Sequence, residues 1–177
     1  LMGKFDEALA SFKEAETILL VANNTSDYEL AGLYNNTGLV YQDMGDLASA
    51  AENFEKALTY LEKVPDNDAE IATNRANLAV TYYNSGNRER ALEYLNTAIS
   101  MFENLDGGLN PHYAGALNTK AVMLFNSGDT AGAAETFEKA IEKKSFARFG
   151  REQSKVKLAT LGNDAGIIGA ALLWKNE

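Results

Sequence analysis

Four glycines at an almost constant spacing are the feature that most constrains the fold of this chain. Gly3, Gly45, Gly86 and Gly128 recur with a period of about 42 residues, in the range of known repeat architectures. Each glycine is followed by alanine five residues later, by an aromatic residue or leucine nine residues later, and by alanine twelve residues later. Self-similarity at a fixed period predicts a solenoid of stacked repeats, an architecture that presents an extended surface for recognition.

The apolar residues between these glycines recur every three or four positions, which is the period of an amphipathic helix. Gly45, Gly86 and Gly128 are therefore each expected to end one helix in a left-handed conformation. The Asp or Asn that follows each of them is expected to cap the next helix. Polar, turn-rich segments at residues 23–27, 65–68 and 106–111 separate the helix pairs. The predicted helices cover residues 4–22, 27–44, 47–63, 68–85, 88–104, 111–127 and 130–146.

Composition limits the classes of function. The chain has 177 residues, a net charge of -9 and no cysteine. The negative charge argues against nucleic-acid binding, which needs a basic surface, and favours basic or neutral partners. The absence of cysteine excludes disulfides and zinc–thiolate sites and fits a reducing compartment, so we expect a cytoplasmic protein. No apolar run approaches the ~20 residues that a membrane span needs, so we expect no membrane partner.

Candidate catalytic and metal-binding residues are few. His112 is the only histidine and follows Pro111 in a linker, where we expect a surface or capping role. Residues 43–46 lack the alternating ligands of a calcium loop, and Gly107–Gly108 is too short for a phosphate-binding loop. We therefore expect no enzyme activity, no metal ion and no cofactor.

Small and aromatic residues occupy matching positions in successive repeats. In the first full repeat they are Tyr34, Thr37, Gly38, Tyr41, Gly45, Ala50, Phe54 and Ala57. This pattern resembles the tetratricopeptide repeat (TPR) signature over roughly residues 3–146, with a period about eight residues longer than the common ~34. In that respect it is similar to the long-repeat branch of kinesin light chains. The resemblance implies an all-α, right-handed superhelix of antiparallel helix pairs with protein or peptide partners.

The repeats divide the chain into a half repeat, three full repeats and a tail, at residues 1–26, 27–67, 68–109, 110–146 and 147–177. The half repeat has only a second helix, so its apolar face is expected to be covered by upstream sequence, by another chain or by nothing. In the tail, a basic linker precedes a run of small and apolar residues at 161–173, which we expect to form a C-terminal helix. This run resembles the carboxyl-terminal end of ROK-family sugar kinases and repressors, although no phosphate- or sugar-binding motif of that family accompanies it.

Asparagines recur on the first helices, which line the concave face of such an array. Asparagine offers a donor and an acceptor, so a ladder of asparagines can hydrogen-bond the main chain of an extended peptide. The resemblance to the long-repeat branch implies this role for Asn36 and Asn77, while Thr119 takes the third place and Tyr83 and Phe125 add apolar contact. The complete set of candidate peptide-binding residues is Asn35, Asn36, Asn77, Tyr83, Asn84, Asn118, Thr119, Phe125 and Asn126.

These observations predict a non-enzymatic scaffold that binds an extended peptide or a partner helix in its concave groove. A clamp for a terminal carboxylate is not expected, because the positions that would hold lysine and arginine are Asn35, Leu39, Asn77, Gly115 and Thr119. Three alternatives stay open. The chain could be a regulatory segment of a larger ROK-type kinase or repressor, a sensor of a short signalling peptide, or a module that forms homo-oligomers through its exposed first helix.

Overall fold

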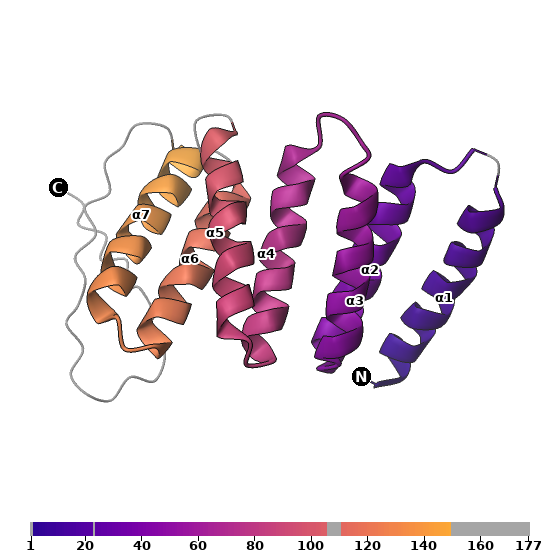
Figure 1. Ribbon diagram of the computed structural model, residues 1–177, viewed down its shortest axis with the longest axis horizontal. Coiled ribbons are helices and arrows are strands. Elements are labelled where there is room, and N and C mark those ends of the chain that lie inside the picture. Colours follow the sequence, from indigo (N-terminus) through magenta and orange to yellow (C-terminus); the bar gives the residue numbers. More distant parts are fainter. Residues whose placement is uncertain (1, 23, 106–110, 150–177) are drawn as a thin grey trace. The chain divides into compact units, whose positions relative to one another are not determined.

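The computed structural model describes residues 2–22, 24–105 and 111–149, and within them every regular element is an α-helix (Figure 1). The prediction of an all-α fold is therefore confirmed. Each observed helix begins and ends close to its predicted bounds, and the largest differences are at the carboxyl-terminal ends. The helices are α1 (Met2–Val21), α2 (Asp27–Met44), α3 (Leu47–Leu61), α4 (Asp68–Asn84), α5 (Arg88–Asn104), α6 (Pro111–Asn126) and α7 (Thr130–Phe149).

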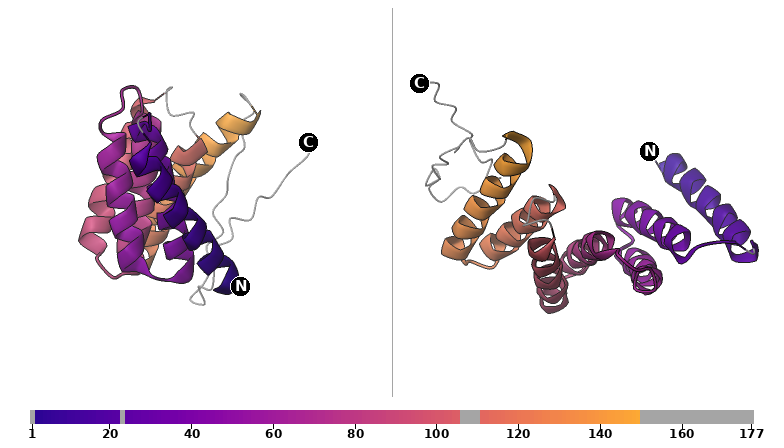
Figure 2. Two further views of the ribbon diagram at one scale, coloured as in Figure 1. Left: turned by 90° about the vertical axis from the view of Figure 1, so that its right-hand side faces the viewer. Right: turned by 90° about the horizontal axis from the view of Figure 1, so that it is seen from above.

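The helices belong to two compact units, residues 1–108 and residues 109–177. In the first unit each helix from α1 to α5 packs against the next one along the chain, and α2 also touches α4. In the second unit α6 packs against α7. The right-hand view of Figure 2 shows the two helices of each hairpin next to each other. The repeat boundaries inside the units stay a prediction.

The glycines between paired helices adopt the backbone conformation that their spacing predicts. Gly45, Gly86 and Gly128 have φ values of 81°, 85° and 90°, a left-handed region that side chains disfavour. The residue after each glycine caps the next helix, as where Asp46 Oδ1 accepts a hydrogen bond from the Ser49 backbone N–H at 3.1 Å. Equivalent caps follow the other two glycines. The short turns therefore hold each pair antiparallel.

Close helix packing explains the small residues of the repeat. A Cβ atom added to Gly38 on α2 would lie 2.8 Å from the ring of Phe54 on α3, closer than real Cβ contacts. The positions that face the first helix are fully buried in both complete pairs of the first unit. They are Ala50, Phe54 and Ala57 on α3 and Ala91, Leu95 and Ala98 on α5, each 0% exposed.

Helix α1 differs because no first helix precedes it among the described residues. Its matching side chains Ala8, Phe12 and Ala15 are only partly buried. At its end, Ile18 is 61% exposed and Val21 is 78% exposed. Homo-oligomer formation through this exposed helix stays a prediction.

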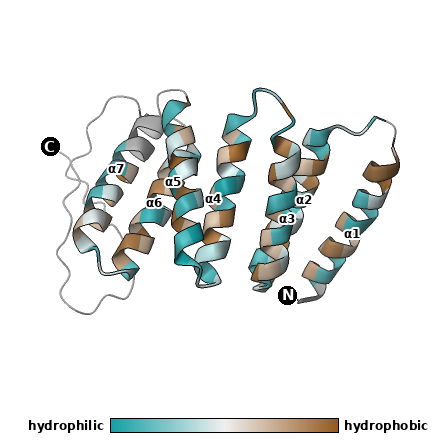
Figure 3. Ribbon diagram, viewed as in Figure 1, coloured by the Kyte–Doolittle hydropathy of each residue, from teal (hydrophilic) through white to brown (hydrophobic). Residues whose placement is uncertain are grey.

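Hydrophilic residues are spread along the helices from α1 to α6 (Figure 3). In the part of the chain that the structure describes, no helix is both long enough and apolar enough to cross a membrane. The basic linker, the C-terminal helix and the ROK-like run that the sequence predicts in the tail lie outside the described residues, apart from residues 147–149, which end α7.

Candidate functional site

Three asparagines connect the first helices α2 and α4. The side-chain oxygen Oδ1 of Asn35 on α2 accepts a hydrogen bond from Nδ2 of Asn77 at 3.2 Å. A longer contact, 3.4 Å, joins the same oxygen to Nδ2 of Asn74. Side-chain amides on the first helices thus connect the two repeats. The two amides on α4, those of Asn74 and Asn77, lie one helix turn apart.

A second bridge lies further along the same two helices. Gln42 Nε2 on α2 donates to Thr81 Oγ1 on α4 at 2.9 Å, and that hydroxyl donates in turn to the Asn77 backbone carbonyl at 2.9 Å. The polar groups that join the two helices are called the polar seam below. Its members are Asn35, Gln42, Asn74, Asn77 and Thr81.

One member of the polar seam is left with an unused acceptor. Asn74 is 1% exposed, and its Oδ1 has no hydrogen-bond partner. Burying an unsatisfied polar atom costs about 1–3 kcal/mol. The seam therefore contains a buried oxygen that a donor would stabilise.

Repeat-matched residues form a stripe beside the seam. Each helix supplies four residues, and the spacings of seven, three and four residues place them on one helix face. Leu39 is 37% exposed, Asn77 and Val80 are half-buried, and the others are exposed. This stripe is called the first-helix face, and it consists of Glu29, Asn36, Leu39 and Asp43 on α2 and Glu70, Asn77, Val80 and Asn84 on α4.

The predicted binding residues of the first unit have different surroundings. Asn36 is exposed and makes no side-chain hydrogen bond with the described residues, and Asn84 is also exposed. Asn35 is half-buried and belongs to the seam, as does Asn77. Tyr83 is half-buried on α4. The carboxamide of Asn36 thus makes no hydrogen bond with the described residues, whereas Asn77 already donates one hydrogen bond to Asn35.

The second unit contains the other four predicted residues, all on α6. Asn118 and Asn126 are exposed, and Phe125 is half-buried. The Thr119 hydroxyl donates to the Gly115 carbonyl of its own helix at 3.1 Å, so it offers a ligand mainly its remaining acceptor. A role in binding for all nine residues stays a prediction.

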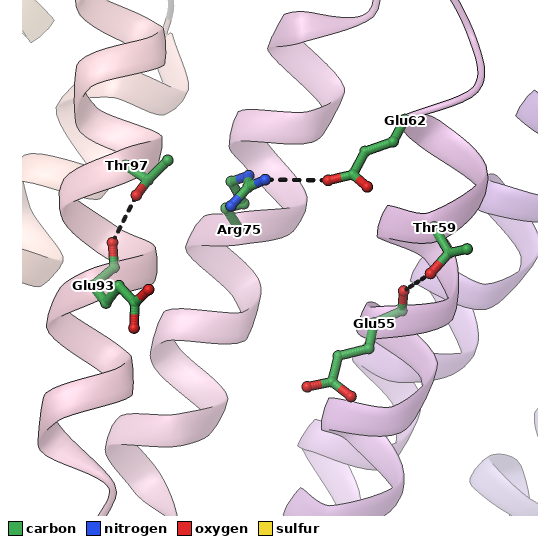
Figure 4. A network of polar contacts seen from close by, with 6 residues as sticks. All are labelled: Glu55, Thr59, Glu62, Arg75, Glu93 and Thr97. Carbon is green, nitrogen blue, oxygen red and sulfur yellow. Dashed lines mark hydrogen bonds and ion pairs between the residues drawn. The ribbon is translucent and has the colours of Figure 1, made fainter.

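The charges on α2 and α4 are strongly unequal. The two helices contain five acidic residues and one basic residue. That basic residue, Arg75, bonds Glu62 Oε1 beyond the end of α3 at 3.2 Å, as Figure 4 shows. Asp43 and Glu70 make no ion pair with other described residues, so the first-helix face presents net negative charge.

Tyrosines on the first helices bond acidic residues of the preceding second helices. The Tyr34 hydroxyl donates to Glu16 Oε1 at 2.7 Å, and burial together with this bond raises its pKa. The Tyr82 hydroxyl donates to Glu55 and accepts from Arg90 Nη1 at 2.9 Å. Burial first, and the Glu55 carboxylate second, raise the pKa of Tyr82 to about 12. Both hydroxyls stay neutral at physiological pH and serve packing between helices.

The predicted set of binding residues omits Gln42, Asn74 and Thr81 of the seam and the acidic and apolar members of the first-helix face. A signal was present, because Glu29 and Glu70 stand one repeat apart, as do Leu39 and Val80. Comparing every solvent-facing position of adjacent first helices, and not the asparagines alone, would have found them.

In the described part of the chain, no group of three or more His, Cys, Asp or Glu side chains is arranged to hold a metal ion.

Comparison with known proteins places the sequence among repeat proteins. It matches the tetratricopeptide repeat family over residues 1–63, 29–104 and 68–144. It is 30% identical over 117 residues to the photosystem I assembly protein Ycf3 of Rippkaea orientalis, covering 66% of this chain and 61% of that protein. It is 26% identical over 142 residues to the Arabidopsis thaliana protein kinesin light chain-related 1, covering 79% of this chain and 23% of that protein. The chain spans less than two thirds of each relative's length.

A solved structure shares the fold. BtubC (BKLC) from P. vanneervenii aligns with a TM-score of 0.75 and 24% sequence identity, covering 86% of this chain and 61% of that one. At this level of identity the similarity is evidence of a shared fold and not of a shared partner.

Proposed function

The chain belongs to the tetratricopeptide repeat family, and from this we propose that it is a non-enzymatic scaffold that binds an extended peptide along its first helices. The observation that supports the proposal is the pair Asn36 and Asn77, which stand at matching positions of adjacent repeats. Both lie on the first-helix face, where a peptide backbone can reach them.

The two asparagines would serve a peptide differently. Asn36 is exposed and offers its whole carboxamide, one acceptor oxygen and two donor hydrogens, to the main chain of a ligand. Asn77 gives one hydrogen to Asn35, which leaves its other hydrogen and its oxygen. Because that bond already fixes the Asn77 rotamer, a ligand loses less side-chain entropy there. Asn77 is therefore the pre-organised contact.

The relatives support an interaction role without naming a partner for this chain. One is named as an assembly protein and another as kinesin light chain-related. On α6 of the second unit, Asn118, Phe125 and Asn126 provide a similar mixture of amide and aromatic side chains. We infer that holding other proteins, and not chemistry on a small substrate, is the activity of the chain.

The test is selection of peptides from a random library on the purified chain, repeated with an Asn36→Ala/Asn77→Ala variant. Removing two peptide-facing hydrogen-bond partners should cost about 1–3 kcal/mol, or about 5- to 150-fold in affinity. Asn96→Ala is a matched control, because Asn96 is an exposed asparagine on the second helix α5. Asn35→Ala breaks the seam while leaving both carboxamides, and it separates binding from helix pairing.

Enriched peptides that lose affinity for the double variant and keep it for Asn96→Ala would support the proposal. No enrichment, or equal affinity for the double variant, would refute it.

A further inference from the structure

The unpaired charges of the first-helix face point to the chemistry of its ligand. Asp27 lies 3.7 Å from Lys63, and Glu29 accepts bonds from Ser26, so these two acidic residues have partners. Asp43 and Glu70 are exposed and have none among the described residues. They lie toward opposite ends of the face, one on each helix.

The cation that could neutralise this surface is engaged elsewhere. Arg75 is the basic residue of α4, and its guanidinium bonds Glu62 at the end of α3 (Figure 4). Helix α2 contains no basic residue. A ligand with positive charge would therefore meet uncompensated carboxylates, whereas an acidic ligand would meet like charges.

Two apolar side chains lie along the face between the positions of the two carboxylates. Leu39 and Val80 occupy matching positions, each one helix turn before Asp43 and Asn84 respectively. Leu39 is 37% exposed, a large hydrophobic side chain in contact with water. Covering such carbon surface with an aliphatic side chain favours binding.

We propose that the first-helix face of residues 1–108 binds an extended basic peptide. Lysine or arginine side chains pair with Asp43 and Glu70, and an aliphatic side chain covers Leu39 and Val80. This inference rests on the proposed function and adds the charge class of the partner. It concerns the first unit only, since α6 in the second unit contains Lys120 and no acidic residue.

The experiment uses the full chain and three libraries of nine-residue peptides. Each peptide contains one leucine, and the flanking positions are rich in Lys and Arg, in Asp and Glu, or in Gln and Asn. Affinities of the best peptides are measured by fluorescence anisotropy at low and high salt. The basic library should give the tightest binders, and salt should weaken them, because exposed charge pairs are screened.

Asp43→Asn/Glu70→Gln is the test variant, because both substitutions keep size and remove charge. It should weaken the basic peptides about 2- to 30-fold, the span expected for two solvent-exposed ion pairs, and reduce the salt dependence. Glu89→Gln/Glu93→Gln is the control, an equal charge change at exposed positions of the second helix α5. The control should bind basic peptides almost as well as the unmodified chain. Circular dichroism checks that each variant is folded.

The outcomes separate the two proposals. Neutral or acidic peptides that bind best and depend on Asn36 and Asn77 would overturn the basic preference and leave the scaffold proposal standing. Basic peptides with equal affinity for the test variant and its control would also overturn it. Basic peptides that depend on Asp43 and Glu70 but not on the asparagines would support the charge class and refute the asparagine contacts. Binding from no library would refute both.

Discussion

Two glycines on α2 should respond oppositely to the same substitution. Gly38 is buried, and a Cβ atom there would lie 2.8 Å from two ring carbons of Phe54. Gly32 is exposed, and a Cβ atom there would meet no heavy atom within 4 Å. We expect Gly38→Ala to destabilise the fold and Gly32→Ala to stabilise it.

The magnitude follows from two opposing effects. Alanine in a helix interior is more favourable than glycine by about 0.5–1 kcal/mol, and this gain applies to both sites. Overpacking of a close-packed core costs about 1–3 kcal/mol, and this loss applies only to Gly38. The helix-propensity gain cancels when the two variants are compared. Their free energies of unfolding should therefore differ by about 1–3 kcal/mol.

The neighbouring repeats show how the clash can be relieved. The position that matches Gly38 is Ala79, and the position that matches Phe54 is the smaller Leu95; both are fully buried. Gly38→Ala combined with Phe54→Leu would reproduce that pair in the first full repeat. We expect the double variant to lose less stability than the sum of its single substitutions, since the added methyl group fills space that the ring vacates.

Urea unfolding followed by circular dichroism measures these differences. With a slope of about 2 kcal/mol per M, the midpoints of the two alanine variants should lie about 0.5–1.5 M apart. Equal midpoints, or a higher midpoint for Gly38→Ala than for Gly32→Ala, would refute the argument that the Phe54 ring is what requires glycine at position 38.

Three further predictions concern the caps, the tyrosines and the seam. Gly86→Ala should lower the free energy of unfolding by about 1–2 kcal/mol in urea, because its φ is 85°; an unchanged midpoint would contradict this. The pKa of Tyr82 is raised from 10.0 to about 12, so its stabilising contribution is complete below pH 10 and is lost as the pH rises toward 12. Between pH 9 and 12 the melting temperature should therefore fall less steeply for Tyr82→Phe than for the unmodified chain. Equal slopes for the two proteins would contradict this prediction. A double-mutant cycle between Asn35 and Asn77 should give a coupling of about 0.5–1.5 kcal/mol, whereas additive losses would mean that the bond contributes nothing.

The helices and their turns could be predicted because the signals are local. A left-handed residue at the end of a helix favours glycine, and Asp or Asn at the next position can cap the following helix whatever lies around it. Gly45 and Asp46 show both effects within two residues. Since these preferences need no knowledge of distant contacts, their recurrence once in every repeat was sufficient for the fold.

The candidate site was less predictable because it depends on how each helix is rotated about its axis. Asn35 and Asn36 are adjacent, about 100° apart around the helix. Asn35 contacts α4, and Asn36 faces solvent. Their orientation follows from the packing of Gly38 against Phe54, a contact between two helices. Asn74 was harder still, because a buried asparagine with an unused oxygen contradicts the usual cost of burying polar groups.

The three matched positions of the asparagine ladder illustrate why equal residues need not contribute equally to binding. Asn36 makes no bond among the described residues, Asn77 is held by Asn35, and Thr119 bonds a carbonyl of its own helix. A peptide bound to the first unit as proposed would therefore have to order Asn36 and would find Asn77 already oriented. Substitution of Asn36 removes ligand contacts alone, whereas substitution of Asn77 also releases Asn35 and loosens α2 from α4. The loss at Asn77 should consequently appear in stability as well as affinity, and only the loss at Asn36 measures recognition by itself.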